Sequence, residues 1–243
     1  MMGRKLVYKR GGGSVQLPRQ ASLPIGVLEQ ATHSVNRVFE ALHEVSPHVS
    51  GLLGMRNLSA FVGAAFASEL QDASDGLLLL NPHQDGYPDL LLMDSVGREA
   101  LEMALPGAKE PFSPFPPGGL EIKATCGDVE TPAQLARRGL TKPAIGDQRV
   151  HLIKGLSWKA HHRETNNLLA LVWDFVEQIP AIAAVLYSSG LLEDDWGRIV
   201  QPRPGGGRTT SVSIMGRSGI GKLCSNTLLV LDGPYDGLLN RYR

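Results

Sequence analysis

The sequence predicts an α/β protein in which a mixed central sheet is flanked by helices. Two stretches in the first third of the chain place apolar residues at helical spacing, and several later stretches are short apolar runs of strand length. The chain has 243 residues, of which 42% are hydrophobic, so it can bury one sizeable core. We therefore expect a single domain over residues 1–243, or a core with an appended lobe.

Two helices are predicted ahead of the first central strand. Residues 24–43 place apolar side chains three, four and seven positions apart, and Pro47 helps to end this helix. Residues 57–73 form the second helix, in which Gly63 and Ala64 allow close approach of a neighbour. The apolar positions are Ile25, Leu28, Val35, Phe39 and Leu42 in the first helix and Leu58, Phe61, Val62, Ala65, Phe66 and Leu70 in the second.

Strands are predicted where short apolar runs are bounded by turn residues. Residues 105–119 contain five prolines and can be neither regular helix nor regular strand, so they are expected to form a surface excursion, either a contact loop or a plain connector. The predicted strands are residues 77–80, 88–93, 120–124, 168–176, 181–187 and 209–215.

Three polar side chains lie on two of these strands. Side chains two positions apart share one face of a strand, so Glu121 and Lys123 point the same way, while Ile122 faces a packing layer. Asp89 stands at the start of another apolar run. If the two strands pair, Asp89 lies near Glu121.

Two carboxylates and an ammonium group on one face suit phosphodiester hydrolysis. The carboxylate oxygens can hold Mg²⁺, and the lysine can position the attacking water. Pro88-Asp89 followed by Glu121-Ile122-Lys123 resembles the motif of the PD-(D/E)xK nuclease superfamily, and the type II restriction endonucleases within it look closest. The resemblance covers roughly residues 55 to 190.

The resemblance implies a restriction-endonuclease-like mixed sheet flanked by helices, with a catalytic core over about residues 55–190 and a Gly/Arg-rich DNA-recognition extension over residues 191–243. It implies Mg²⁺-dependent cleavage of double-stranded DNA at a short specific sequence, with Asp89, Glu121 and Lys123 as catalytic residues and the two acids as metal ligands. A symmetric double-strand cut needs two active sites, so a homodimer is expected.

Glu69 is a candidate third metal ligand. In several restriction endonucleases an acid from the helix before the catalytic strands adds to the metal site, and Glu69 lies near the end of the second predicted helix. The alternative is an ordinary glutamate on a solvated helix face.

Charge is distributed unevenly along a chain whose net charge is zero. Residues 1–130 carry ten basic and fifteen acidic side chains, and residues 131–243 carry fourteen and nine. Cations in the second half could follow DNA phosphates while acids in the first half surround the metal. The same distribution also fits a salt-bridged globule without DNA.

Two acid-poor segments, residues 131–163 and 197–222, are the candidate DNA surface. The second has seven glycines and no acid, which allows close approach to phosphates, although a merely solubilising loop would have the same composition. Of the adjacent His161 and His162, one at most could join a site, and DNA contact or a structural role is favoured over metal ligation. The candidate DNA-binding residues are Arg203, Arg208, Thr209, Arg217, Lys222, Lys159 and His162, with Arg208 and Arg217 as the candidate guanine readers.

Residues 216–222 match the phosphate loop G-x-x-x-x-G-K, but Leu223 stands where a Ser or Thr must hold Mg²⁺. No nucleotide cofactor is therefore expected. Cys126 and Cys224 lie outside any metal-ligand spacing, and no run of eighteen apolar residues occurs, so a soluble cytoplasmic protein without a membrane partner is expected.

Two other functions fit the same residues. A DNA repair or nicking nuclease of the same superfamily would share the site and cut one strand. A non-catalytic DNA-binding protein would bind without cutting, although binding alone does not need three matched polar groups on an apolar sheet.

Overall fold

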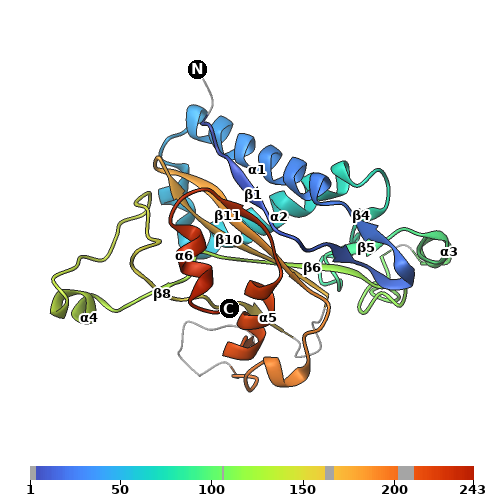
Figure 1. Ribbon diagram of the computed structural model, residues 1–243. Coiled ribbons are helices and arrows are strands. Elements are labelled where there is room, and N and C mark those ends of the chain that lie inside the picture. The colour runs from blue at the N-terminus through green and yellow to red at the C-terminus, as the bar shows by residue number, and fades with distance from the viewer. Residues whose placement is uncertain (1–3, 106, 162–166, 202–210) are drawn as a thin grey trace.

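The computed structural model describes residues 4–105, 107–161, 167–201 and 211–243. Its centre is a seven-stranded mixed sheet with helices on both faces, which confirms the predicted α/β class (Figure 1). The strand order is β1-β13-β11-β10-β6-β5-β4. Neighbours in this sheet are antiparallel except β6 and β10, which are parallel. The strands are β1 (Tyr8–Arg10), β4 (Leu78–Leu80), β5 (Leu90–Leu92), β6 (Gly119–Thr125), β10 (Leu168–Val176), β11 (Ile179–Ser188) and β13 (Thr227–Leu231).

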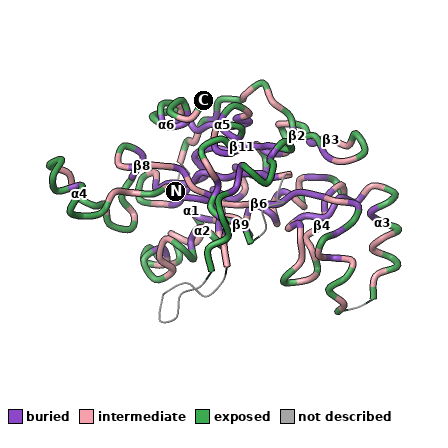
Figure 2. The backbone as a smooth tube through the Cα atoms, turned by 90° about the horizontal axis from the view of Figure 1, so that it is seen from below, coloured by how far each residue is buried: buried purple, intermediate pink, exposed green. Residues whose placement is uncertain are grey.

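β10 and β11 form the hairpin at the centre of the sheet, where the sequence predicts two strands over residues 168–176 and 181–187. Glu177 and Gln178 make the turn, both with positive φ. Nearly every residue of the two strands is buried, because helices cover both faces of the sheet. Figure 2 shows the buried segments gathered in the sheet and the exposed ones in the outer loops.

α1 (Ile25–Val45) and α2 (Val49–Ala73) cover one face of the sheet (Figure 1). α1 buries a row at helical spacing that includes Leu28, Val35 and Phe39, so the prediction for residues 24–43 is confirmed. α2 begins eight residues earlier than predicted, and Gly54, with φ 67°, interrupts it. Among the described helices α2 alone has the length and apolar composition that could cross a membrane; its buried row, which includes Leu58, Val62 and Phe66, packs in the main core.

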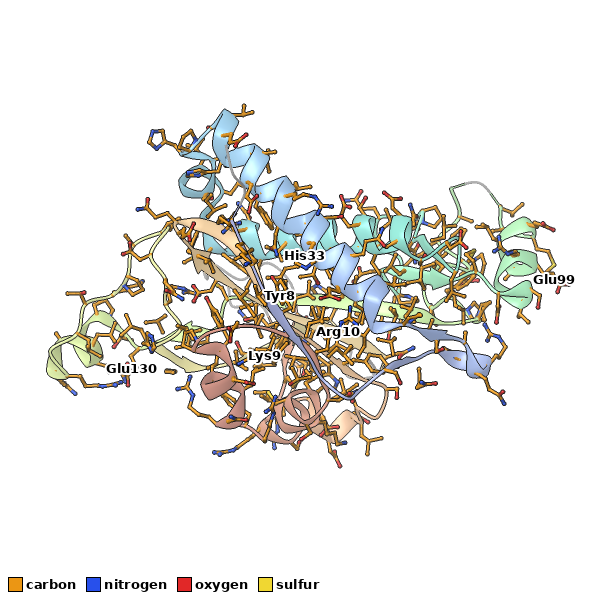
Figure 3. All side chains as sticks on the ribbon, turned by 45° about the horizontal axis from the view of Figure 1, so that its top comes forward. Tyr8, Lys9, Arg10, His33, Glu99 and Glu130 are labelled. Carbon is orange, nitrogen blue, oxygen red and sulfur yellow. The ribbon has the colours of Figure 1, made fainter. Side chains whose placement is uncertain are left out.

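The N-terminal strand β1 is tied to α1 and to the sheet by one side chain. The hydroxyl of Tyr8 donates to the carbonyl of Ile182 and accepts a hydrogen bond from Asn36 Nδ2 at 2.7 Å. The Tyr8 ring meets the ring of His33 edge to face, with 5.3 Å between centroids (Figure 3). Residues 8–10 therefore belong to the core sheet, although they precede the predicted catalytic core.

The C-terminal segment is also part of the sheet rather than an extension of it. β13 lies between β1 and β11, and α5 (Arg217–Ser225) and α6 (Tyr235–Asn240) lie on the face opposite α1 and α2 (Figure 1). Residues 191–243, predicted as a DNA-recognition extension, therefore include β13, which is the neighbour of the preceding hairpin in the sheet.

The region from residue 105 to 119 contains no helix and no strand before Gly119 among its described residues, as the prolines predict. Phe112 and Phe115 pack with Leu91 and Met93 in a small second core beneath α3 (Ser95–Glu102). The remaining elements are peripheral: β2 (Val15–Gln16), η1 (Pro18–Gln20), β3 (Ser22–Leu23), β7 (Asp128–Val129), α4 (Pro132–Arg137), β8 (Ile153–Gly155), β9 (Lys159–Ala160), η2 (Glu193–Asp195) and β12 (Ser213–Ile214).

Candidate active site

The pairing of β5 with β6 brings the predicted acids together. Leu90 lies opposite Leu120 and Leu91 opposite Gly119 in an antiparallel register, so Asp89 comes to the side of Glu121. The two backbones approach closely at Gly119, where a Cβ atom would lie 1.9 Å from the carbonyl oxygen of Leu90. The predicted proximity of Asp89 and Glu121 is confirmed.

The two carboxylates are fixed by reciprocal main-chain hydrogen bonds. The amide of Asp89 donates to Glu121 Oε2 at 3.2 Å, and the amide of Ile122 donates to Asp89 Oδ2 at 2.8 Å. Each acid is therefore held by the strand that carries the other, which restricts the rotation of both side chains.

Lys123 joins the two acids. Its ammonium group is hydrogen-bonded to Glu121 Oε1, and it lies 3.9 Å from Asp89 Oδ2. Glu121 and Lys123 share one face of β6, as their spacing predicts. On the other face, Ala124 lies 4.0 Å from the position that a Cβ of Gly63 on α2 would take.

The pKa values of Glu121 and Lys123 are both shifted from their ordinary values in this buried site. Removal from water, together with the charge of Asp89, raises the pKa of Glu121 to about 7 against the lowering effect of Lys123. Burial lowers the pKa of Lys123, but the charges of Glu121 and Asp89 outweigh it and the pKa of this lysine is raised. The pair therefore keeps its lysine charged, while Glu121 changes charge near neutral pH.

A cavity of about 490 Å³ opens beside these groups. Asp89, Lys123 and the edge of β6 form one part of its lining, and small side chains of α2 form a second part, which includes Ala60, Gly63 and Ala64. The loop of residues 81–86 forms the third part. A substrate group can therefore reach the carboxylate of Asp89 and the ammonium group of Lys123 from solvent.

Glu69 does not lie at this cavity. Ala60, Ala64 and Ala67 of α2 line it, and Glu69 follows Ala67 by two positions, which turns its side chain by about 200° around the helix axis. Glu69 is half-buried on another side of α2. The proposed third metal ligand is therefore not brought to the site.

The donor set of the site fits Mg²⁺. Asp89 and Glu121 offer carboxylate oxygens, and Mg²⁺ is commonly held by one or two carboxylates together with water and substrate phosphates. Within the described residues no group of three or more His, Cys, Asp and Glu side chains could hold a metal ion. Any cation held by these two carboxylates alone would take the rest of its coordination from water and substrate.

The sequence missed one group of cavity residues, Asn81, His83 and Gln84. Their turn-rich composition predicts a link between strands, and the structure shows this link. Its approach to Asp89 follows from the short antiparallel β4–β5 pairing, which folds the link back over the end of β5. The signal in the sequence was a histidine six residues before the motif aspartate.

The predicted DNA-binding residues have mixed outcomes. Arg203, Arg208, Thr209 and His162 lie outside the described residues. Lys159 on β9 and Arg217 at the start of α5 are exposed. Of the strand predicted over residues 209–215, the described part shows β12 at residues 213–214, paired with β9.

Lys222 is an exposed residue whose ammonium group is tied to the buried carboxylate of Asp195. Its Nζ lies 2.6 Å from Asp195 Oδ2 and donates to the carbonyl of Gly190 at 3.0 Å. Burial raises the pKa of Asp195, but Lys222 and the amide of Leu192 outweigh it and the pKa is lowered. The phosphate-loop-like residues 216–222 therefore form the start of α5 and its anchoring ion pair.

Comparison of the chain with protein-family models, with curated proteins and with solved structures gives no match.

Proposed function

We propose that this chain is a type II restriction endonuclease, which hydrolyses phosphodiester bonds of double-stranded DNA at a short specific sequence with Mg²⁺. The observation that carries the proposal is the contact of Asp89, Glu121 and Lys123 at an open cavity. Adjacent strands from residues 78–92 and 119–188, covered by α2, would form the restriction-endonuclease-like core.

Asp89 and Glu121 would hold one or two Mg²⁺ ions, since both carboxylates belong to the same hydrogen-bonded cluster. When bound, the ion supplies Lewis acidity and neutralises charge that grows on the scissile phosphate. Lys123 donates to Glu121 and would orient the attacking water beside the phosphate. The main-chain hydrogen bonds to both acids keep them in place while the substrate enters.

Exposed cations would supply phosphate contacts on the DNA. Lys159 and Arg217 are exposed, and we include the undescribed Arg203, Arg208, Thr209 and His162 in the proposed DNA surface. Because cutting both strands of a symmetric site needs two active sites, we propose that the enzyme acts as a homodimer.

Digestion of several plasmids of known sequence with Mg²⁺ tests this function. The wild type is expected to give discrete fragments whose sequenced ends share one short motif. Asp89→Ala is expected to abolish cleavage and to keep DNA binding. Asp85→Ala is the matched control, because Asp85 is exposed in the same link and does not line the cavity.

The products also separate the related functions. Plasmid that stops at the open circle would indicate a nicking enzyme with the same site. Binding of DNA without cleavage by the wild type, or full cleavage by Asp89→Ala, would overturn the proposal.

A further inference from the structure

His83 belongs to a link that is attached directly to the candidate catalytic strand. The link runs from β4 to Asp89, and Asn81 closes it at both ends. The amide of Asn81 donates to the carbonyl of Asp89 at 2.9 Å, and its Nδ2 donates to the carbonyl of Pro88 at 2.9 Å. The position of the link is therefore tied to the position of Asp89.

Three hydrogen bonds fix His83 within this link. Its amide donates to Asn81 Oδ1 at 3.0 Å, and its carbonyl accepts from the amide of Gly86 at 2.9 Å. The amide of Asp85 donates to His83 Nδ1 at 3.1 Å, which restrains the ring itself. Glycine is required at position 86, because a Cβ atom on this residue would clash with Asn81 Oδ1 at 2.2 Å.

The hydrogen bond from Asp85 determines which ring nitrogen of His83 can donate. Nδ1 accepts a hydrogen bond from the amide, so the neutral ring carries its own proton on Nε2. His83 lines the same cavity as Asp89 and Lys123. Nε2 is thus the ring nitrogen left to meet a ligand there.

Two other polar residues of the cavity, Ser59 and Asn81, have side chains that are already hydrogen-bonded within the protein. Ser59 Oγ accepts from Trp173 Nε1 at 3.0 Å and donates to the carbonyl of Met55. Asn81 Nδ2 donates to the carbonyls of Pro88 and Phe112. The α2 side of the cavity is otherwise lined by Ala and Gly, so a phosphate oxygen that points away from Asp89 and Lys123 would need a donor from the link.

We propose that His83 is a substrate-contacting residue that donates its Nε2 proton in a hydrogen bond to a non-bridging oxygen of the phosphodiester. The inference rests on the proposed function and adds a protein hydrogen-bond donor to the phosphate, whereas Lys123 would orient the attacking water. The proton is shared and not transferred, because a neutral imidazole that lost it would become an imidazolate. The group acts by stabilising the charge on the phosphate.

Two substrates and three variants test this role. The substrates are plasmid DNA and bis(p-nitrophenyl) phosphate, a small diester that needs no recognition sequence, each with Mg²⁺. Glutamine places an amide donor near the position of Nε2, whereas asparagine places its amide near Nδ1. His83→Ala and His83→Asn are expected to lower kcat/KM about 10- to 100-fold on both substrates, and His83→Gln is expected to recover much of the loss.

The controls separate substrate contact from folding. His48→Ala removes an exposed histidine elsewhere and is expected to match the wild type. Mg²⁺ affinity and the urea unfolding midpoint of the three His83 variants are expected to stay at wild-type values, since His83 holds no metal in this arrangement.

The outcomes distinguish the two proposals. Wild-type rates in His83→Ala, with Asp89→Ala inactive, would overturn the role of His83 and leave the nuclease intact. Equal loss in all three His83 variants with a lowered unfolding midpoint would assign His83 a structural role and also overturn it. A wild type that cleaves neither substrate would overturn the proposed function and this inference with it.

Discussion

The main chain of Asp89 holds the side chain of Glu121: the amide of the first donates to Oε2 of the second at 3.2 Å. The return contact runs from the strand of Glu121, since the amide of Ile122 donates to Asp89 Oδ2. Burial at this contact raises the pKa of Glu121 to about 7. Three of the predictions below follow from this coupling of geometry and charge.

Glu121 should make the metal-free protein less stable as the pH rises. Its pKa is about 7 in the folded state and has an ordinary value of 4.5, so the folded state binds the proton more tightly than the unfolded state. The stabilising contribution is fully present below pH 4.5 and is lost as the pH rises through 7, a change of roughly 3 kcal/mol. Urea unfolding in EDTA at pH 5 and pH 8 measures it.

The matched variant for this measurement is Glu121→Gln, which cannot ionise. The free energy of unfolding of the variant minus that of the wild type should be larger at pH 8 than at pH 5 by roughly 3 kcal/mol. Parallel pH profiles for the two proteins would show that Glu121 does not titrate in this range.

Mg²⁺ binding should strengthen as the pH rises towards 7. The ion needs the ionised carboxylate of Glu121, so binding releases one proton, and the affinity should rise about tenfold per pH unit below the pKa. Calorimetric titration at several pH values measures this slope. Glu121→Gln should remove the dependence, and Glu69→Gln should bind Mg²⁺ as the wild type does, because Glu69 lies away from the cavity.

Replacing Lys123 with Met should destabilise the metal-free protein at high pH. The change leaves the buried carboxylate of Glu121 beside Asp89 without its cation, and we expect a loss of about 2 kcal/mol at pH 8. The loss should be less than half as large at pH 5, where Glu121 is protonated. Lys109→Met, at an exposed position, serves as the control. An equal loss at both pH values would contradict the role of Glu121 in this effect.

Residue spacing along the sequence was sufficient to predict the elements whose apolar residues form a local pattern. The helix of residues 24–43 and the runs that form β10 and β11 follow from spacing along single elements, and the contact of Asp89 with Glu121 follows once β5 and β6 pair. β1 and β13 were missed. Their pairing partners lie far away in the chain, so the local sequence does not indicate where either strand would join the sheet.

In the candidate site, too, some features could be predicted from local spacing and others could not. Glu121 and Lys123 share a face because they are two apart on one strand, which the sequence states directly. The place of His83 depends on how the β4–β5 link folds back, and the absence of Glu69 from the cavity depends on the rotation of α2 about its axis. Both are set by tertiary packing.

Replacing Lys222 should affect stability and replacing Arg217 should affect DNA binding, although both residues lie on α5. Lys222→Ala leaves the buried Asp195 without its ion pair, so the free energy of unfolding at neutral pH should fall by about 2 kcal/mol with little change in DNA affinity. Arg217→Ala removes an exposed cation and should weaken DNA binding with unchanged stability. Urea unfolding and DNA binding in EDTA measure both. If Lys222→Ala lost DNA affinity and kept its full stability, Lys222 would instead be a DNA-contacting residue.

Filling the cavity from α2 should block the substrate without unfolding the protein. Ala64 is exposed and lines the cavity opposite Asp89 and Lys123, so Ala64→Leu adds three carbon atoms to that space and removes no buried contact. We expect DNA cleavage and bis(p-nitrophenyl) phosphate hydrolysis to fall at least about tenfold, while the unfolding free energy changes by less than about 0.5 kcal/mol. Ala41→Leu makes the same substitution at an exposed position of α1 and should leave both activities unchanged. A cavity that admits the phosphodiester cannot accept this leucine without loss, so wild-type rates in Ala64→Leu would place the reaction elsewhere on the molecule.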